Sequence, residues 1–314
     1  MTQRALLAQR DVFGDTMVEL CRQDPRIILL DGDLANSTKS DKVAVAVADR
    51  FFMMGIAEQN LAGVAAGMAT VGLKPWVSSF AAFLATRDLD QVRVVIAQPG
   101  LNVKLAAHYS GLLTGYTGKT HQVVNDIAIM RSLPNMVVVA PCDGVETRAA
   151  MIALDAHIGP AYLRLTRDPA PVITGSASPF VLGRGVVLRE GTAIALIATG
   201  TQAVRTLEAS EVLAADGIDA YVLHVPTIKP LDEDAVVAAA QRCRCVLVCE
   251  EHSVYGGLGG AVAEVLGRRH PSHVEILGLR DVDGESGPND ALLEKYGLTA
   301  GHVARRVRAL LAIA

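Results

Sequence analysis

The chain has 314 residues, a formal net charge of −4 at pH 7, and a composition that is 51% hydrophobic and 20% charged. This length is typical of two domains that each bury a core, and the absence of a basic run longer than two residues argues against nucleic acid as a main partner. No secretory signal or apolar run of membrane-spanning length is visible, and the five cysteines, an odd number, argue against a disulfide framework. We therefore expect a cytoplasmic protein.

Apolar runs of strand length alternate with helical patterns along the first half of the chain. One helical pattern is Leu61, Val64, Ala65 and Met68, which recur at intervals of three and four residues, and another covers residues 144–156. This alternation predicts right-handed crossovers and a mostly parallel sheet with helices on both faces. The strands predicted in this half are residues 26–33, 75–80, 101–107, 135–141 and 161–167.

A stretch rich in Pro, Gly and Ser, residues 168–191, is typical of a linker. The alternation then restarts, with strands predicted at 192–199, 218–225, 245–251 and 274–279. We therefore predict an α/β fold of two doubly wound domains with mostly parallel sheets. The first domain is predicted at residues 1–170, the linker at 171–190 and the second domain at 191–314.

The core of the segment GYTGKTH, Gly118-Lys119-Thr120, is the ending of a nucleotide-binding P-loop. A P-loop needs a glycine five residues before Gly118 so that the backbone can approach the phosphates, and that position is Leu113. The segment also follows its predicted strand only after a long loop. A nucleotide site is therefore disfavoured, and a glycine-rich surface loop is predicted.

Cys243, Cys245, Cys249 and His252 lie close together in the sequence and suggest a metal site. The intervening residues read as a buried strand, whose alternation would send the three cysteines to one face beside apolar neighbours. We therefore predict buried cysteines that behave as small hydrophobic residues, and no metal ligands in this chain.

Glu58 lies where an apolar run meets a helical pattern, in the segment FFMMGIAEQNLAGVAAGMATVG at 51–72. A glutamate at the start of a helix is most often only a favourable partner of the helix dipole. Its apolar neighbours nevertheless predict dry surroundings, and Gly63 and Gly67 would let a helix or a ligand come close. From the residues alone, both interpretations remain open.

Several segments resemble the pyrimidine-binding half of transketolases: MGIAEQN with AGVAAGMA, SSFAAF, KTHQVVNDIAIMRSLPNM and PCDGVETRAA. The segments VLHVPTIKPLDEDAV and EEHSVYGGLGGAVAE resemble the C-terminal domain of the same family. The resemblance covers essentially all 314 residues, with the motifs in family order. It implies a thiamine-diphosphate enzyme fold built from a pyrimidine-binding domain and a transketolase C-terminal domain.

The resemblance implies roles for residues around the cofactor. Glu58 would hydrogen-bond a ring nitrogen of the aminopyrimidine and so promote loss of the thiazolium proton. Phe80 and Phe83 would pack on the pyrimidine, although two phenylalanines alone indicate a core equally well. Asp33 belongs to the expected cofactor-binding residues. His108, at the end of a predicted strand, would contact the reacting hydroxyl and carbonyl groups of the sugar, or else is only a satisfied polar residue there.

The resemblance also implies a site for the phosphate of a sugar. In GKTHQ, His121 matches a histidine that reaches this phosphate, and Arg167 in LRLTRD matches a phosphate-binding arginine. Arg10 and Ser37 stand on two further family positions for the same group. Arginine offers a fork of donors suited to phosphate, so the segment that looked like a P-loop is expected to bind a sugar phosphate.

The sequence departs from the family at three points. Thr117 stands where an aspartate usually bonds a hydroxyl of the donor sugar, and Thr86 replaces a frequent aromatic residue. The loop from His108 to His121 is also about one residue longer than usual. These departures leave the stereochemistry of the donor open and indicate a specialised sugar or sugar-like substrate.

A Gly-Asp-Gly motif, followed some distance later by Asn, normally holds the cofactor diphosphate through Mg²⁺. The segment DGDLANS at 31–37 reads Asp-Gly-Asp and aligns instead with the phosphate-binding Ser37. We therefore expect the diphosphate site and the Mg²⁺ ligands on a separate partner subunit. The thiamine diphosphate would lie between the two chains, most simply in an α2β2 heterotetramer with a two-fold axis.

The function predicted from the resemblance is that of the C-terminal subunit of a split transketolase, which transfers a two-carbon ketol unit between phosphorylated sugars once its partner is bound. Three other interpretations are a subunit similar to deoxyxylulose-phosphate synthase, one similar to the β subunit of 2-oxo-acid dehydrogenases, and a non-catalytic regulatory homologue. A P-loop ATPase is the remaining and least compatible alternative.

Overall fold

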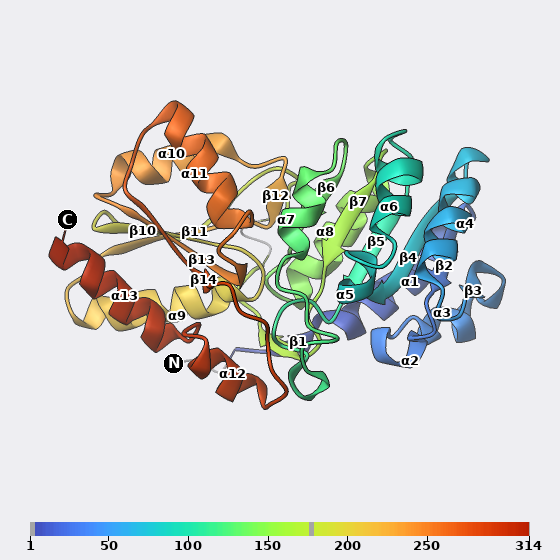
Figure 1. The fold of residues 1–314 in the computed structure, drawn as a ribbon, viewed down its shortest axis with the longest axis horizontal. Coiled ribbons are helices and arrows are strands. Elements are labelled where there is room, and N and C mark those ends of the chain that lie inside the picture. Colours follow the sequence, from blue (N-terminus) through green and yellow to red (C-terminus); the bar gives the residue numbers. More distant parts are fainter. Residues whose placement is uncertain (1–3, 176–178, 314) are drawn as a thin grey trace.

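A seven-stranded sheet forms the centre of the first domain in the computed structural model, which describes residues 4–175 and 179–313 (Figure 1). Its strand order is β12-β6-β7-β5-β4-β2-β3, and every neighbouring pair is parallel except β12 with β6. The strands are β2 (Ile27–Asp31), β3 (Phe51–Met53), β4 (Lys74–Phe80), β5 (Lys104–His108), β6 (Val137–Val139), β7 (Ala161–Arg164) and β12 (Thr227–Lys229). This arrangement confirms the predicted doubly wound, mostly parallel sheet.

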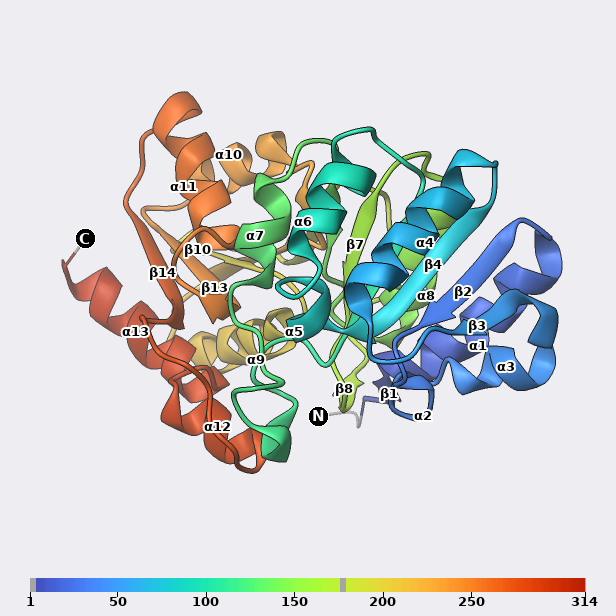
Figure 2. The ribbon, with the colours of Figure 1, turned by 45° about the vertical axis from the view of Figure 1, so that its right-hand side comes forward.

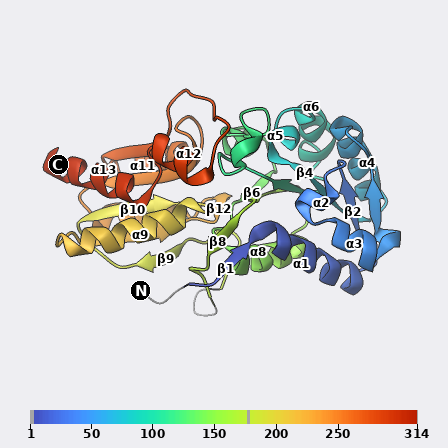
Figure 3. The same ribbon diagram turned by 90° about the horizontal axis from the view of Figure 1, so that it is seen from below.

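Helices cover both faces of this sheet, as the view from below shows (Figure 3). On one face, α1 (Gln9–Gln23) and α8 (Gly144–Ala156) pack around Phe13, Met17 and Trp76. The opposite face carries α4 (Glu58–Thr70), α5 (Ala81–Leu84), α6 (Leu89–Gln91), a π-helical segment (Val92–Ala97) and α7 (Asp126–Ser132), which stand in front of the sheet in Figure 2. Strands buried on both faces explain the near-continuous apolar runs in the sequence.

The second domain contains a five-stranded sheet in the order β14-β13-β10-β11-β9, parallel except for the edge strand β9. Its strands are β9 (Val186–Arg189), β10 (Ile194–Ala198), β11 (Ala220–His224), β13 (Val246–Ser253) and β14 (Val274–Leu279). The helices α9 (Gln202–Ala215) and α13 (Ala300–Ile313) pack on one face, whereas α10 (Glu233–Arg242) and α11 (Leu258–Arg269) pack on the other. The short helix α12 (Asn289–Lys295) lies near the first domain (Figure 1).

The connection between the domains is more structured than a linker. β8 (Pro169–Pro171) pairs with β1 (Leu6–Ala8), and β9 completes the edge of the second sheet. The predicted linker at 171–190 contains the strand β9 near its C-terminal end, and its residues 176–178 lie outside the described part of the chain. Within the described residues, no helix has the length and apolar character needed to cross a membrane.

The predicted cysteine strand begins later than expected. Cys245 and Cys249 are buried in the core of the second domain beside Leu247, as predicted. Cys243 lies instead at the end of α10 and packs against a different apolar cluster, because the strand begins only at Val246. Cys243 has an extended backbone just after α10 and is only partly buried, unlike Cys245 and Cys249.

Candidate active site

The carboxyl ends of the parallel strands gather most of the predicted site residues at one edge of the first sheet. Phe80 ends β4, His108 ends β5, and Arg167 follows β7 by three residues. Asp33 follows β2 by two residues. Ligand sites of open α/β sheets lie at this edge, since the loops that leave the strands there are free to vary.

Glu58 is the first residue of α4, and its side chain is only 1% exposed. Its Oε2 accepts a hydrogen bond of 2.7 Å from Nη1 of Arg87, while its Oε1 is buried and has no partner among the described residues. The carboxylate is buried, as expected from its apolar neighbours, and a guanidinium that was not predicted lies beside it. One oxygen of Glu58 is left to accept a proton or a hydrogen bond.

Arg87 also covers an aromatic ring. Its guanidinium carbon lies 4.2 Å from the centre of the Phe83 ring, so that one flat, cationic group both stacks on Phe83 and pairs with Glu58. Phe83 and Thr86 open onto a cavity of about 530 Å³ that residues of the second domain close from the far side. The same carboxylate and ring could receive a flat nitrogen heterocycle.

Asp88, which the sequence analysis missed, is a second carboxyl group next to Glu58. It is fully buried, and neither of its oxygens has a hydrogen-bond partner in residues 4–175 and 179–313. Burial raises the pKa of Asp88 to about 8, and the negative charge of Glu58 adds to this rise. The segment TRDLDQ gave no signal for this burial, since its polar residues suggest an exposed turn.

Phe80, Phe83 and His121 form one aromatic group. The Phe80 and Phe83 rings are 5.8 Å apart at their centres, and the ring of His121 meets both edge-on at 5.9 and 5.4 Å. The Nδ1 of His121 lies 2.8 Å from the hydroxyl of Thr120. The structure therefore brings the predicted cofactor ring positions and His121 together.

Arg10 lies beside Ser37 and Arg167, and the two arginines meet at a residue that was not predicted, Tyr109. Arg10 donates through Nη1 to the hydroxyl of Tyr109 at 2.9 Å and to the carbonyl of Ser37 at 3.3 Å. Arg167 donates through Nε to the same Tyr109 hydroxyl at 3.2 Å. The Tyr109 ring stacks on Phe80 at 4.1 Å, which joins this anion-binding group to the aromatic group.

His108 does not take part in this arrangement. Its side chain is fully buried, packs edge-on against Phe13 at 4.6 Å, and has no hydrogen-bond partner on either nitrogen among the described residues. Burial lowers the pKa of His108 to about 3, and the positive charge of Arg10 lowers it further, so the ring is neutral. Its position does not support the predicted contact with the sugar, because Tyr109 faces the site. The loop from His108 to His121 is about one residue longer than is usual in the family. If the loop is counted from Tyr109 instead, this extra residue disappears.

Two aspartates at the end of β2, Asp31 and Asp33, differ in exposure. Asp33 is exposed, has a left-handed backbone with φ of 69°, and its side chain forms no hydrogen bond within the described part of the chain. The buried carboxylate is Asp31, which accepts from the amide of Leu34 at 2.7 Å and the hydroxyl of Ser40 at 2.5 Å. Asp31 therefore fixes the loop that carries Ser37, whereas the cofactor role of Asp33 stays a prediction.

The glycine-rich loop is held by the second domain and lacks the strand and helix of a P-loop. Glu251 of β13 accepts hydrogen bonds from the amides of Leu112 at 2.8 Å and Leu113 at 3.2 Å. Gln122 donates to the carbonyl of Glu285 at 2.9 Å. Thr117, one of the family departures, bonds within the loop to the hydroxyl of Thr114 at 2.7 Å. The C-terminal domain thus positions a loop of the candidate site.

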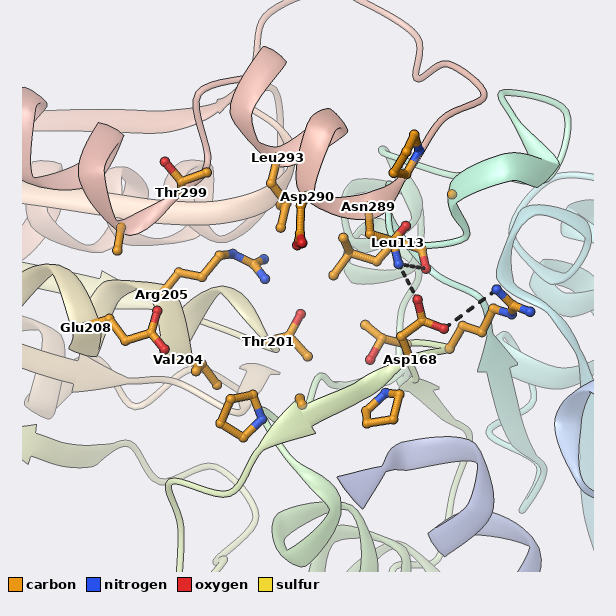
Figure 4. A pocket seen from close by; sticks show the side chains of 18 of the residues that line it. Leu113, Asp168, Thr201, Val204, Arg205, Glu208, Asn289, Asp290, Leu293 and Thr299 are labelled. Atoms are coloured by element: carbon orange, nitrogen blue, oxygen red, sulfur yellow. Dashed lines mark hydrogen bonds and ion pairs between the residues drawn. The ribbon is translucent and has the colours of Figure 1, made fainter. Parts of the chain in front are cut away.

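A cavity of about 730 Å³ lies between the two domains beside this loop (Figure 4). Asp168 accepts a hydrogen bond from Asn289 of α12, and Arg205 of α9 pairs with Glu251 at 2.9 Å. Arg167 lines this cavity and also contacts Tyr109. Asp168 and Arg205 in this cavity are thus paired with groups of the second domain.

The chain matches two protein families. "Transketolase, pyrimidine binding domain" covers residues 6–171, and "Transketolase, C-terminal domain" covers residues 183–303. A 6-deoxy-6-sulfo-D-fructose transketolase subunit of Clostridium sp. is 42% identical over 94% of this chain and 92% of its own length. An apulose-4-phosphate transketolase subunit of Phocaeicola vulgatus is 36% identical over 93% and 94% of the two chains.

Solved structures agree with this assignment. A split gene transketolase, described as an inactive beta4 tetramer, superposes with a TM-score of 0.91 and 45% identity over 98% of this chain and 99% of that one. A 1-deoxy-D-xylulose-5-phosphate synthase of Symbiobacterium thermophilum is 37% identical, but this chain spans only 47% of its length. The synthase alternative is therefore the less direct fit. This chain belongs to the transketolase family and corresponds to the C-terminal subunit of a split, two-chain transketolase.

Proposed function

We propose that this chain, together with a separate diphosphate-binding subunit, transfers a two-carbon ketol unit between phosphorylated sugars. The observation that carries this proposal is the junction of two groups at one sheet edge: a buried glutamate with one free oxygen, and two arginines that converge on Tyr109. The first group suits a nitrogen heterocycle and the second suits an anion. Ketol transfer between sugar phosphates requires both.

The residues present fit the aminopyrimidine end of thiamine diphosphate. Oε1 of Glu58 is a buried acceptor without a partner, and the face of Phe83 carries a flat cation that a heterocycle could replace. Glu58 would hold a proton at a ring nitrogen, while Phe80 and Phe83 would exclude water around it. The cofactor, when bound, supplies the carbon nucleophile for ketol transfer. The Mg²⁺ ligands would be contributed by the partner subunit.

The surface around Glu58 suits a partner subunit. Ile56, two residues before Glu58, is 73% exposed, and Phe52 and Met53 are exposed on the edge strand β3. Gly63 and Gly67 of α4 have open space where a side chain would stand. An apolar rim of this kind is typical of an interface, so the diphosphate-binding subunit would cover Glu58, most simply in an α2β2 assembly in the cytoplasm.

At the other end, Arg10, Ser37, His121 and Arg167 would bind and orient the terminal phosphate of the sugar. Guanidinium groups match the oxygens of a phosphate and remain charged at any physiological pH. The relatives bear the names of transketolases for a sulfonated sugar and a phosphorylated sugar, both of which carry a terminal anion. This similarity supports an anionic sugar as the substrate class.

Reconstitution tests the proposed function. We expect no transketolase activity from the isolated chain, and activity after it is mixed with its diphosphate-binding subunit, thiamine diphosphate and Mg²⁺. Replacing Ile56 by Asp should weaken association with the partner about tenfold or more, measured by calorimetry, because it places a charge in the apolar rim. The matched control is Ile158→Asp, at a residue between α8 and β7 that is also largely exposed. Turnover by the isolated chain, or equal association of both variants, would contradict the proposal.

A further inference from the structure

Tyr109 links the two arginines that are proposed to bind the substrate phosphate. Its hydroxyl accepts one hydrogen bond from Arg10 and one from Arg167, at 2.9 and 3.2 Å. A phenol oxygen can accept two hydrogen bonds and donate one. Both acceptor positions are therefore used, and the hydroxyl proton is donated to no residue in the described ranges 4–175 and 179–313.

The backbone and the ring hold this hydroxyl in place. Tyr109 has a left-handed φ of 56°, which is costly for an aromatic residue and is kept only where neighbours impose it. The next residue, Ser110, bonds through its amide and its hydroxyl to the carbonyl of Leu165, at 3.0 and 2.9 Å. The ring is 5% exposed and stacks on Phe80 at an angle of 19°. Tyr109 is therefore fixed from three directions.

The charges around Tyr109 are not balanced. Arg10 has no carboxylate within ion-pair distance among the described residues, and its Nε is buried without a partner. In the part of the chain that the structure describes, the one carboxylate within ion-pair distance of Arg167 is that of Asp168, at 3.6 Å and partly exposed. Two positive charges thus converge on one neutral oxygen. Such an arrangement favours a negatively charged group nearby, because that group would offset the repulsion between the guanidiniums.

We propose that Tyr109 is a specificity-determining residue that completes a three-donor cradle for the terminal phosphate of the sugar. Its hydroxyl holds both guanidiniums at a fixed separation and gives its own proton to a phosphate oxygen. This inference rests on the proposed function for the identity of the substrate. It places Tyr109 at the phosphate, whereas its neighbour His108 was expected at the reacting hydroxyl and carbonyl groups of the sugar.

Kinetics of the reconstituted enzyme test the cradle with Tyr109→Phe, which keeps the ring and its stacking but removes the hydroxyl. We expect the KM for a phosphorylated acceptor to rise about tenfold, because a donor to a charged group is lost and the arginines are released. The KM for the unphosphorylated acceptor should change less than about twofold. The control is Tyr116→Phe, an exposed tyrosine in the same loop, which should leave both values unchanged.

Two results would overturn this role. Equal changes on both acceptors would make Tyr109 a structural residue, and a lower KM for the phosphorylated acceptor would make its hydroxyl an obstacle to the anion. An acceptor with a sulfonate in place of the phosphate sharpens the test. A phosphate dianion gains more from three donors than a sulfonate monoanion. In Tyr109→Phe, the KM for the phosphorylated acceptor should therefore rise more than the KM for the sulfonated one. A larger rise for the sulfonated acceptor would contradict the choice of phosphate.

Binding of inorganic phosphate to the isolated chain separates this inference from the proposed function. We expect phosphate to raise the melting temperature above that in chloride of equal ionic strength, and Tyr109→Phe to reduce this difference. If reconstitution gives no ketol transfer while this difference persists, the proposed function fails and the cradle stands. If ketol transfer is observed, but phosphate raises the melting temperatures of the unmodified chain and of Tyr109→Phe equally, only the proposed role of Tyr109 fails.

Discussion

The two ends of the candidate site differ in how complete they are within one chain. At the anion end, Arg10, Tyr109 and Arg167 come from α1 and from two strand ends of the same sheet, and they already contact one another. At the cofactor end, Glu58 keeps one buried oxygen without a partner and lies beside exposed apolar residues such as Ile56. The first end is preassembled, whereas the second needs another molecule.

This difference has a physical cause in the cost of burying charge. A buried carboxylate is destabilising unless a cation or several donors compensate it, and in this chain Arg87 provides the compensation for Glu58. Arg87 also covers the ring of Phe83. The isolated subunit therefore stabilises its unfinished end with its own side chain, which a ligand and a partner would have to displace.

The largest expected effect is at the cofactor end. Replacing Glu58 by Gln keeps the shape of the side chain but removes the group that would hold a proton, so turnover of the reconstituted enzyme should fall about 100-fold or more. The KM for phosphorylated acceptors should stay within about twofold, since the anion end is separate. Steady-state kinetics measures both, with the exposed Glu19→Gln on α1 as a control for loss of charge. Near-normal turnover would remove the role assigned to Glu58.

The second effect is at the anion end. Arg167→Ala removes one of the two guanidiniums at Tyr109, so the KM for phosphorylated acceptors should rise about 10- to 100-fold, with a much smaller change for unphosphorylated ones. Arg22→Ala, at the exposed end of α1, is the matched control. Equal losses on both acceptors would mean that Arg167 supports the fold and does not contact phosphate.

The sequence predicted the sheet better than the site because its information about the sheet is local. Apolar runs and helical spacing locate β2, β4 and α4, and the order of motifs places Glu58 at the start of a helix and Phe80 and Arg167 at or just after strand ends. That Tyr109, and not His108, bonds Arg10 and Arg167 could not be decided in this way. Neighbouring residues at a strand end point to opposite faces, and a left-handed backbone at Tyr109 is not visible in the sequence.

Contacts between distant segments were also beyond the sequence. The pairing of Arg87 with Glu58 joins residues 29 positions apart, and Glu251 reaches the loop at Leu112 from 139 positions away. Such contacts depend on how the domains pack. The resemblance to the family predicted roles for residues that match its motifs. It could not reveal Asp88, which precedes α6 and is buried by the packing around that helix.

The smallest effect concerns Asp88 and depends on pH. Burial raises the pKa of this carboxyl group from its ordinary value of 3.8 to about 8, so in the folded protein it is mostly neutral at pH 7. A group whose pKa is higher in the folded state stabilises the fold most below its unfolded pKa, and that contribution is lost as the pH rises through about 8. The free energy of unfolding should therefore fall between about pH 4 and pH 8.

Asp88→Asn tests this titration, since asparagine keeps the size of the side chain and cannot ionise. Its free energy of unfolding, measured by urea denaturation, should depend less on pH over that range than that of the unmodified chain. Turnover of the reconstituted enzyme should stay within about twofold below pH 7, where both side chains are neutral, and should differ only as the pH approaches 9, where a second negative charge would otherwise form beside Glu58. Identical pH profiles of the free energy of unfolding would mean that the pKa of Asp88 is the same in the folded and the unfolded chain, so that burial does not keep this carboxyl group neutral beside Glu58.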